Sequence, residues 1–498
     1  YDEQNKILFS GDTLFRFGCG RIFEGDYKQM YDSLEKIKRL SNNTNVYCGH
    51  EYTIHNLNFL NSIFKNCEPL KKIEIKILDQ IKKFDSSMPF NLGEEKVLNP
   101  FLSLESIYFQ DFMKNMQFNS LRNNFVQADY IIIGPETFRG SSTPLLDLRS
   151  PAIFASIEQI YFEFSGGNAD PMGIRNFIQW TQENWQSPVP QYVLLLGDSG
   201  YDYRNITGQS SIIVPTIQVQ SARKYATDDR LATLYGNIPE VALGRFPARN
   251  ESEVINFIEK VISIETEPIL GQWRQRVTLV ADDPVRPEPN HGSINTGKSH
   301  TINSEQLYNI IPKSIITNKL YLIEYPETSD ESVYGVSKPE ATQDLFKYLN
   351  QGTAIITYIG HGSPYQLAQE KLLSYNRGDI NKINTGRKLP LWIVGTCSFG
   401  YFDDPLSESF AEELIRADMN AAASVIATSR PITVVGNERY TLDIFESVFN
   451  LFFSGKVSSD DLKLKCNVLK VLSPITNSSL PTKVTFCSII LPDIALIC

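Results

Sequence analysis

The chain has 498 residues, of which 42% are hydrophobic and 21% charged, as expected for a folded globular protein of at least two domains. Its formal net charge of -10 argues against a nucleic-acid partner, because phosphate binding needs concentrated Lys and Arg. The sequence shows no apolar run of membrane-spanning length and no secretory leader, and its seven scattered cysteines form neither a disulfide framework nor a CxxC metal pair. Since the first residue is Tyr1 rather than Met, the missing leader says little about the compartment.

The first hundred residues hold two short strand-like runs, each ending in a metal-ligand type of residue. Residues 7–15 (ILFSGDTLF) break at Gly11-Asp12, and residues 45–53 (NVYCGHEYT) break at Gly49-His50. An Asp and a His just past two strand ends are suited to a divalent metal. The alternative is a loop carboxylate and a surface histidine, both solvated.

Three segments in this region are similar to a known family. GDTLFRFGCGRIFEG, VYCGHEYT and LGEEKVLNPFL occur in that order and closely resemble the C-terminal half of glyoxalase II, the hydroxyacylglutathione hydrolase of the metallo-β-lactamase fold. The resemblance covers residues 1–105 and implies a partial metallo-β-lactamase-fold segment. It further implies that Asp12 and His50 are ligands of zinc or iron and that Arg21 and Tyr52 bind substrate.

The same region departs from the family pattern at several positions. The HxHxDH motif that supplies most metal ligands in glyoxalase II does not occur among the five histidines of the chain. Phe23 stands where the family usually has a Tyr, and Ser103 stands where a basic residue is usual. A two-metal hydrolase needs its complete bridging geometry to generate hydroxide. We therefore predict that this segment alone has no thioesterase activity.

Helical spacing of apolar residues between positions 57 and 83, with a break at Pro69, predicts a pair of amphipathic helices. The pattern then weakens, and residues 106–127 are interpreted as a junction.

From residue 128 to 455 short β-rich runs alternate with helical stretches. The predicted strands are residues 130–134, 192–197, 277–280, 354–359, 391–394 and 424–428, and the predicted helices are 153–164, 172–185, 251–265 and 339–349. This alternation predicts an α/β domain with a largely parallel sheet and helices on both faces. Acidic loops at 198–203, 227–229 and 282–283 are either solvated turns or sites for calcium or a basic substrate side chain.

Two of the predicted strands end in reactive side chains. The first ends in Gly360-His361-Gly362 and the second in Gly395-Thr396-Cys397. The intervening thirty or so residues are enough for a crossover helix, so a βαβ unit would place His361 and Cys397 at one sheet edge.

A histidine beside a cysteine can take the thiol proton and later donate it to a leaving amine. The amides of Gly362 and Cys397 are candidate oxyanion donors. The alternative is an inert buried thiol.

The flanking segments resemble a second family. YVLLLGDSGYDY, YATDDRLATLYGNIPEVALGRFPAR, YIGHGSPYQLAQEK, LPLWIVGTCSFGYFDDP and ATSRPITVVGNERY are similar to gingipain-type cysteine peptidases of caspase-like fold, closest to the PorU-type sortase of type IX secretion. The resemblance spans about residues 127–455. It implies Cys397 as nucleophile, His361 as general base and acid, and an acidic residue behind the histidine, for which Glu324 is our candidate.

The predicted function is therefore a cysteine-type endopeptidase that acts on protein or peptide substrates, needs no cofactor, and has secretion-system partners as a possibility. One alternative is a metal-dependent thioesterase, which the glyoxalase II resemblance implies. The other is a non-catalytic chimeric product, which is considered because the two families differ in compartment. The peptidase family implies an exported or cell-surface protein, and the glyoxalase II family a cytoplasmic one. Residues 456–498 show no clear period and stay unassigned.

Overall fold

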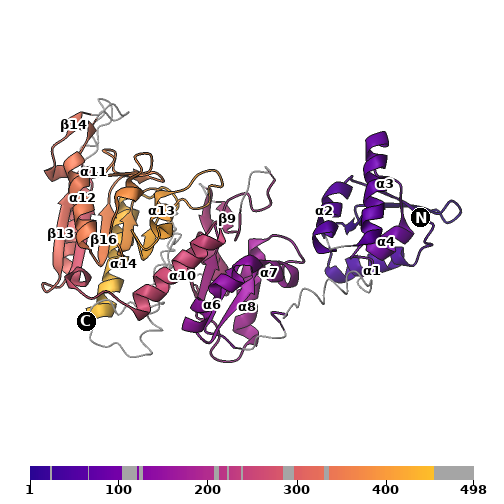
Figure 1. The fold of residues 1–498 in the computed structure, drawn as a ribbon, viewed down its shortest axis with the longest axis horizontal. Coiled ribbons are helices and arrows are strands. Elements are labelled where there is room, and N and C mark those ends of the chain that lie inside the picture. Colours follow the sequence, from indigo (N-terminus) through magenta and orange to yellow (C-terminus); the bar gives the residue numbers. More distant parts are fainter. Residues whose placement is uncertain are drawn as a thin grey trace. The chain divides into compact units, whose positions relative to one another are not determined.

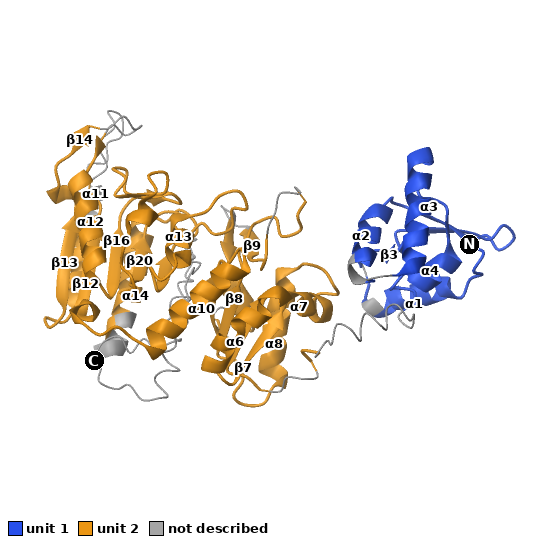
Figure 2. Cartoon of the chain, in the orientation of Figure 1, with its two compact units in different colours: residues 1–119 blue, residues 120–498 orange. Residues whose placement is uncertain are grey.

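In the computed structural model the chain forms two compact units, Tyr1–Asn119 and Ser120–Cys498 (Figure 2). The structure describes residues 1–22, 25–64, 67–103, 120–122, 127–206, 212–220, 224–236, 239–283, 296–329 and 336–453. Most of the predicted junction at 106–127 and all of the unassigned segment 456–498 lie outside these ranges.

The described residues of the first unit form a small sheet, a hairpin and four helices. Strand β4 (Asn45–Cys48) pairs in parallel with β1 (Ile7–Gly11) and antiparallel with β5 (Phe90–Asn91), and β2 (Leu14–Phe15) forms a hairpin with β3 (Gly18–Cys19). The helices are α1 (Tyr27–Lys38), α2 (Thr53–Ile63), α3 (Glu68–Phe84) and α4 (Leu92–Leu98). Helices α2 and α3 confirm the predicted amphipathic pair, and Pro69 lies in the first turn of α3, where its missing N–H is harmless.

A buried carboxyl fixes the β2–β3 hairpin to α4. Glu95 is fully buried, and its Oε2 accepts hydrogen bonds from the Phe17 amide at 2.8 Å and from Asn99 Nδ2 at 2.9 Å. Asn99 also donates to the Gly18 carbonyl at 3.1 Å. Burial raises the pKa of Glu95 to about 7. The LGEEKVLNPFL segment therefore has a structural role in this unit.

The second unit contains two parallel sheets (Figure 1). One has the order β11-β8-β6-β7, built from β6 (Tyr130–Gly134), β7 (Ala152–Ser156), β8 (Tyr192–Leu196) and β11 (Ala242–Phe246). The other has the order β13-β12-β16-β20-β21, built from β12 (Arg276–Ala281), β13 (Ile316–Tyr321), β16 (Ile355–Ile359), β20 (Leu391–Gly395) and β21 (Ser424–Ala427). The predicted strands are thus divided between two sheets rather than joined in one.

Helices cover these sheets. They are α6 (Arg139–Leu148), α7 (Ile157–Phe164), α8 (Pro171–Asn184), α9 (Asp229–Ala232), α10 (Glu251–Thr266), α11 (Thr296–Ile310), α12 (Pro339–Gln351), α13 (Phe410–Arg416) and α14 (Val434–Phe453). Short elements complete the unit: η1 (Glu136–Phe138), β9 (Ile217–Gln220), β10 (Lys224–Thr227), η2 (Gln272–Gln275), η3 (Leu322–Glu324), β14 (Thr328–Ser329), β15 (Val336–Ser337), β17 (Gly362–Ser363), β18 (Gln366–Leu367), β19 (Leu373–Ser374) and η4 (Asp379–Lys382).

Alternation along β16 sorts the core between the two faces of the five-stranded sheet. Ile355 and Ile359 belong to a buried cluster with residues of α11 and α14, whereas Ile356 and Tyr358 belong to a cluster with residues of α12 and α13. The second cluster also includes residues of the four-stranded sheet, so one core runs across both sheets. The predicted helices on both faces are confirmed.

Two predicted helices are wrong. Residues 153–164 divide into strand β7 and helix α7, because the Ser156 hydroxyl accepts from the Gln159 amide and caps the helix there. No α-helix connects β16 to β20; this fully described segment forms β17, β18, β19 and η4 instead. Left-handed backbone at Ala368 (φ 62°), Lys371 (φ 56°) and Gly378 (φ 65°) interrupts any helix in that stretch.

Candidate active site

The pairing of β16 with β20 sets the geometry of the site. Ile359 is opposite Gly395 in this parallel register, and the Gly360 amide donates to the Gly395 carbonyl at 3.1 Å. His361 and Cys397 each follow two residues later, so both leave the sheet at the same carboxyl edge. This placement at one edge is as the sequence predicts, although no crossover helix produces it.

The backbone of His361 is held on both sides. Its N–H donates to Asp282 Oδ2 at 2.8 Å, and its carbonyl accepts from the Tyr358 hydroxyl at 2.6 Å and from the Ala368 amide at 2.9 Å. Asp282 follows β12, and its own amide donates to the Ile359 carbonyl at 3.0 Å. Asp282 and Tyr358 are each only 1% exposed, so this clamp is shielded from water.

Both glycines beside His361 are required by close approach. A Cβ at Gly360 would lie 2.3 Å from Asp282 Cβ, and a Cβ at Gly362 would lie 2.6 Å from Thr396 Oγ1. These distances are too short for any side chain. The Gly-His-Gly sequence thus lets the histidine loop lie directly against the residue that precedes Cys397.

The His361 side chain is half-buried, and its Nε2 has no hydrogen-bond partner among the described residues. Burial lowers its pKa, while the Asp283 charge opposes that shift. A neutral imidazole is the form that can accept a proton. The ring of His300, on α11, lies perpendicular to the His361 ring with the centroids 5.1 Å apart.

Cys397 is half-buried, and its thiol donates to the Ile432 carbonyl at 3.6 Å. Within the described ranges no hydrogen bond joins its sulfur to His361. The following loop is held by the fully buried Asp403, which pairs with Arg430 through two contacts of 2.7 Å and accepts from Gln218 at 2.9 Å. Ser398 donates its amide to the Arg430 carbonyl at 3.3 Å.

The proposed oxyanion amides are available in this arrangement. In the β17–β18 pair the Ala368 amide bonds to the His361 carbonyl, so Gly362, opposite Leu367, is at a non-hydrogen-bonded position. Its N–H is therefore directed away from that ladder. The Cys397 amide has no acceptor in the part of the chain that the structure describes.

Among the described residues no hydrogen bond or ion pair joins Glu324 to His361. Glu324 is exposed on η3, after strand β13, and among the described strands β13 pairs with β12 alone. The carboxylates beside His361 are Asp282 and Asp283, because they follow β12, the neighbour of β16. The sequence shows them as an acidic loop at a strand end, but the strand order that selects them cannot be read from it.

Protein cations already neutralise two of the acidic loops. Asp228 forms a buried pair with Arg245, with Oδ2 to Nε at 2.7 Å. Asp283 pairs with the buried Lys338 ammonium, which also donates to the Leu322 carbonyl at 2.6 Å.

Three buried carboxyl groups lie close together near His361: Asp282, Asp283 and Glu370 have oxygens within 4.8 Å of one another. Burial raises the pKa of Asp282 to about 8, which lowers the negative charge there. Calcium binding stays a prediction.

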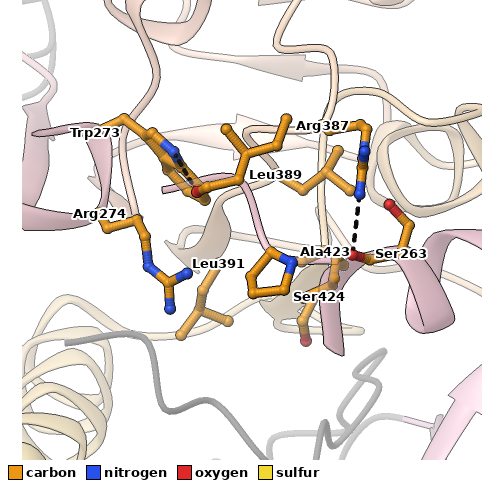
Figure 3. A pocket seen from close by; sticks show the side chains of 11 residues that line it. Ser263, Trp273, Arg274, Arg387, Leu389, Leu391, Ala423 and Ser424 are labelled. Carbon is orange, nitrogen blue, oxygen red and sulfur yellow. Dashed lines mark hydrogen bonds between the residues drawn. The ribbon is translucent and has the colours of Figure 1, made fainter. Parts of the chain in front are cut away.

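Two of the pockets formed by described residues of the second unit differ in their place on the strands. One borders the loop that follows Cys397 and is lined by Asp198, Ile213, Arg249 and residues 404–408. The other is mainly apolar and lies where β20 and β21 begin, at Leu391 and Ser424 (Figure 3). In it Arg387 donates to the Ser263 carbonyl at 3.2 Å and the Trp273 indole donates to the Ile269 carbonyl at 3.1 Å. Of these two pockets, the first borders the loop after Cys397 and the second lies at the opposite ends of β20 and β21.

The predicted metal ligands of the first unit lie close together but are open to solvent. Asp12 Oδ1 and His50 Nε2 are 3.7 Å apart, and their side chains are 60% and 54% exposed. The described residues offer no third His, Cys, Asp or Glu to this pair. Tyr52 stacks on His50 at 5.3 Å, Arg21 is exposed, and Phe23 is outside the described residues. These residues do not complete the metal centre that the glyoxalase II family implies.

Comparison with known proteins decides the family of the larger unit. The sequence model of peptidase family C25 matches residues 123–460, more than half of the chain. The chain belongs to peptidase family C25. This confirms the predicted gingipain-type cysteine peptidase class.

Solved family C25 structures agree in fold. Gingipain R, the Arg-specific cysteine proteinase, matches with a TM-score of 0.51 and 18% identity over 70% of this chain and 74% of that one. The complex of RgpB pro- and mature domains from Porphyromonas gingivalis matches with a TM-score of 0.50 and 18% identity, over 69% of this chain and 73% of that one. At this identity the likeness shows the fold alone, and it confirms the caspase-like α/β class.

The first unit has separate relatives. The model of the hydroxyacylglutathione hydrolase C-terminus matches residues 51–125. Hydroxyacylglutathione hydrolases from Nitrosomonas europaea (46% identity over 99 residues) and Pectobacterium atrosepticum (48% over 101 residues) each align with 20% of this chain. The chain spans 37% and 40% of the length of these two relatives. The glyoxalase II-like character of this segment is confirmed as a similarity.

Proposed function

We propose that this family C25 chain is an endopeptidase in which Cys397 is the nucleophile and His361 the general base and acid. The observation that supports this most is the β16–β20 register, which sends both residues off the sheet at one edge, two positions beyond the paired Ile359 and Gly395. Glycines that tolerate no side chain flank the histidine, and a buried ion pair holds the loop after the cysteine.

The proposed reaction begins when the Cys397 thiol leaves the Ile432 carbonyl and gives its proton to neutral His361. The thiolate attacks the peptide carbonyl carbon, and the N–H groups of Gly362 and Cys397 stabilise the resulting oxyanion. His361 then donates its proton to the leaving amine as the C–N bond breaks. Water, deprotonated by His361, hydrolyses the thioester and restores the thiol.

Asp282 and Tyr358 have a positioning role in this scheme. They bind the amide and the carbonyl of His361, so they fix the main chain from which the base extends. A fixed base at the sheet edge reduces the entropy lost when the catalytic geometry forms.

A peptidyl acyloxymethyl ketone probe, which alkylates activated cysteines, tests the proposal. We expect mass spectrometry to find the adduct on Cys397, no adduct in Cys397→Ala, and labelling slowed by about 10²-fold or more in His361→Ala. Glu324→Gln is the matched control and should label like the wild type. Equal labelling of the wild type and His361→Ala would contradict the assignment of the base.

Finer assignments are further proposals. The similarity to the PorU-type sortase, noted from the sequence, supports a peptide substrate processed during type IX secretion and secretion-system partners. That family implies an exported or cell-surface location, whereas the relatives of the first unit imply a cytoplasmic one. None of the described helices is long and apolar enough to cross a membrane.

A further inference from the structure

A second histidine lies against the proposed catalytic base. His300 is on α11, one of the helices that cover the sheet face formed by Ile355 and Ile359. Its ring meets that of His361 at an angle of 89°, with 5.1 Å between the centroids. His300 comes from a part of the sequence about sixty residues earlier, so only the fold brings the two imidazoles together.

The surroundings of His300 leave both of its ring nitrogens without a bond. The residue is 2% exposed, and neither Nδ1 nor Nε2 has a hydrogen-bond partner among the described residues. A buried polar group without a partner is costly and uncommon in a folded protein. The adjacent His361 has an unpartnered, buried Nε2 of its own. Two neighbouring imidazoles thus each carry buried nitrogens without a partner among the described residues.

Other charged or titratable groups around His361 are already engaged. Asp282 accepts a hydrogen bond from the His361 amide, and Asp283 is paired with Lys338. The Tyr358 hydroxyl donates to the His361 carbonyl. Glu370 belongs to the same carboxylate group as Asp282 and Asp283. The Cys397 thiol donates a hydrogen bond to the Ile432 carbonyl. Among the described residues none of these carboxylates hydrogen-bonds to the His361 ring, and Asp283 acts on the ring through its charge alone. His300 is the imidazole beside it.

We propose that His300 is the positioning residue for the His361 ring, in the place where many hydrolases use a carboxylate. When His361 takes the Cys397 proton through one ring nitrogen, the N–H on its other nitrogen donates to a neutral nitrogen of His300. This hydrogen bond selects one tautomer of His361 and stabilises the imidazolium. Burial and the neighbouring His361 lower the pKa of His300 to about 4, in keeping with a neutral acceptor. The proposal deepens the function proposed above and depends on it.

A matched pair of substitutions separates hydrogen bonding from packing. Gln and Met have similar size and flexibility, but only Gln can accept a hydrogen bond. The readout is the rate of Cys397 alkylation by iodoacetamide as a function of pH, followed by mass spectrometry of the Cys397 peptide so that the other cysteines do not contribute. This assay reports thiolate formation without a peptide substrate.

We expect His300→Met to slow alkylation at pH 7 by about tenfold or more and to move the rise in rate to higher pH, towards that of an unassisted thiol near pH 8.5. His300→Gln should recover most of the rate. Circular dichroism and the thermal midpoint check folding of both variants. If His300→Met alone fails to fold, the nitrogen chemical shifts of the wild-type His361 ring decide: a hydrogen-bonded N–H supports the proposal and an unbonded one overturns it.

The outcomes distinguish this inference from the proposed function. Rapid alkylation of the wild type, lost in His361→Ala but unchanged in His300→Met, would overturn the role of His300 and leave the cysteine–histidine pair standing. Equal loss in the Gln and Met variants would also overturn it, because packing alone would then explain the effect. Alkylation of the wild type no faster than that of His361→Ala would contradict the pair itself.

Discussion

At the scale of single residues, the site depends on buried polar groups that act on the main chain of His361. Asp282 is 1% exposed and accepts the His361 amide, yet burial raises its pKa to about 8. A protonated carboxyl keeps a carbonyl oxygen that can accept this bond. Asp282 thus fixes the loop without placing a full negative charge behind the base at neutral pH.

This raised pKa predicts a pH-dependent stability. An unfolded Asp titrates near 3.9, so between about pH 4 and pH 8 the folded state binds a proton that the unfolded state does not, and the free energy of unfolding falls with rising pH, by at most about 1.4 kcal/mol per pH unit. Asp282→Asn stays neutral and escapes this loss. In denaturant titrations we expect the free energy of unfolding of Asp282→Asn to rise relative to that of the wild type from pH 5 to pH 8.

Asp147→Asn is the control for that titration, because Asp147 is an exposed carboxylate on α6. It should follow the wild type at every pH. A wild type that gains stability from pH 5 to pH 8 relative to Asp282→Asn would refute the raised pKa.

At the scale of elements, the sequence predicts strands better than connections. Runs of consecutive apolar residues at 130–134, 192–197 and 391–394 become β6, β8 and β20, because strands covered on both faces need such runs. The crossover helix fails for a local reason: positive φ at Ala368 and Lys371 is not encoded by glycine, so nothing in the sequence marks it.

In the candidate site, too, some residues can be predicted from the sequence and others depend on long-range packing. The proposed nucleophile and base, Cys397 and His361, are visible as reactive residues at strand ends, and the register places them at one edge. The places of Asp282 and His300 beside His361 could not be predicted from the sequence. They depend on the pairing of β12 with β16 and on the packing of α11, which are contacts between distant parts of the chain. Glu324 shows no described contact with His361, and a strand end alone does not reveal which neighbour a residue faces.

At the scale of the whole molecule, the chain joins two units with different relatives. The larger unit contains both the proposed nucleophile and the proposed base, whereas the first unit holds Asp12 and His50, two exposed residues that the sequence predicts as metal ligands. Two solvent-exposed ligands bind a divalent ion weakly and cannot hold two metals in bridging geometry.

We therefore expect the purified chain to release added zinc from the first unit on dialysis and to show no hydrolysis of S-lactoylglutathione above the uncatalysed rate. Metal analysis and a thioester absorbance assay measure these two properties. Asp12→Ala serves as the control and should behave like the wild type. Turnover that disappears in Asp12→Ala would show that the first unit is a working thioesterase and would contradict this prediction.

The most direct test of the central claim is the cleavage of an unfolded protein substrate by the purified chain, followed over time by mass spectrometry of the products. We predict that the wild type produces new peptide termini, that Cys397→Ala produces none, and that Asp12→Ala cleaves like the wild type. Cleavage that persists in Cys397→Ala would contradict the assignment of Cys397 as the nucleophile of this family C25 chain.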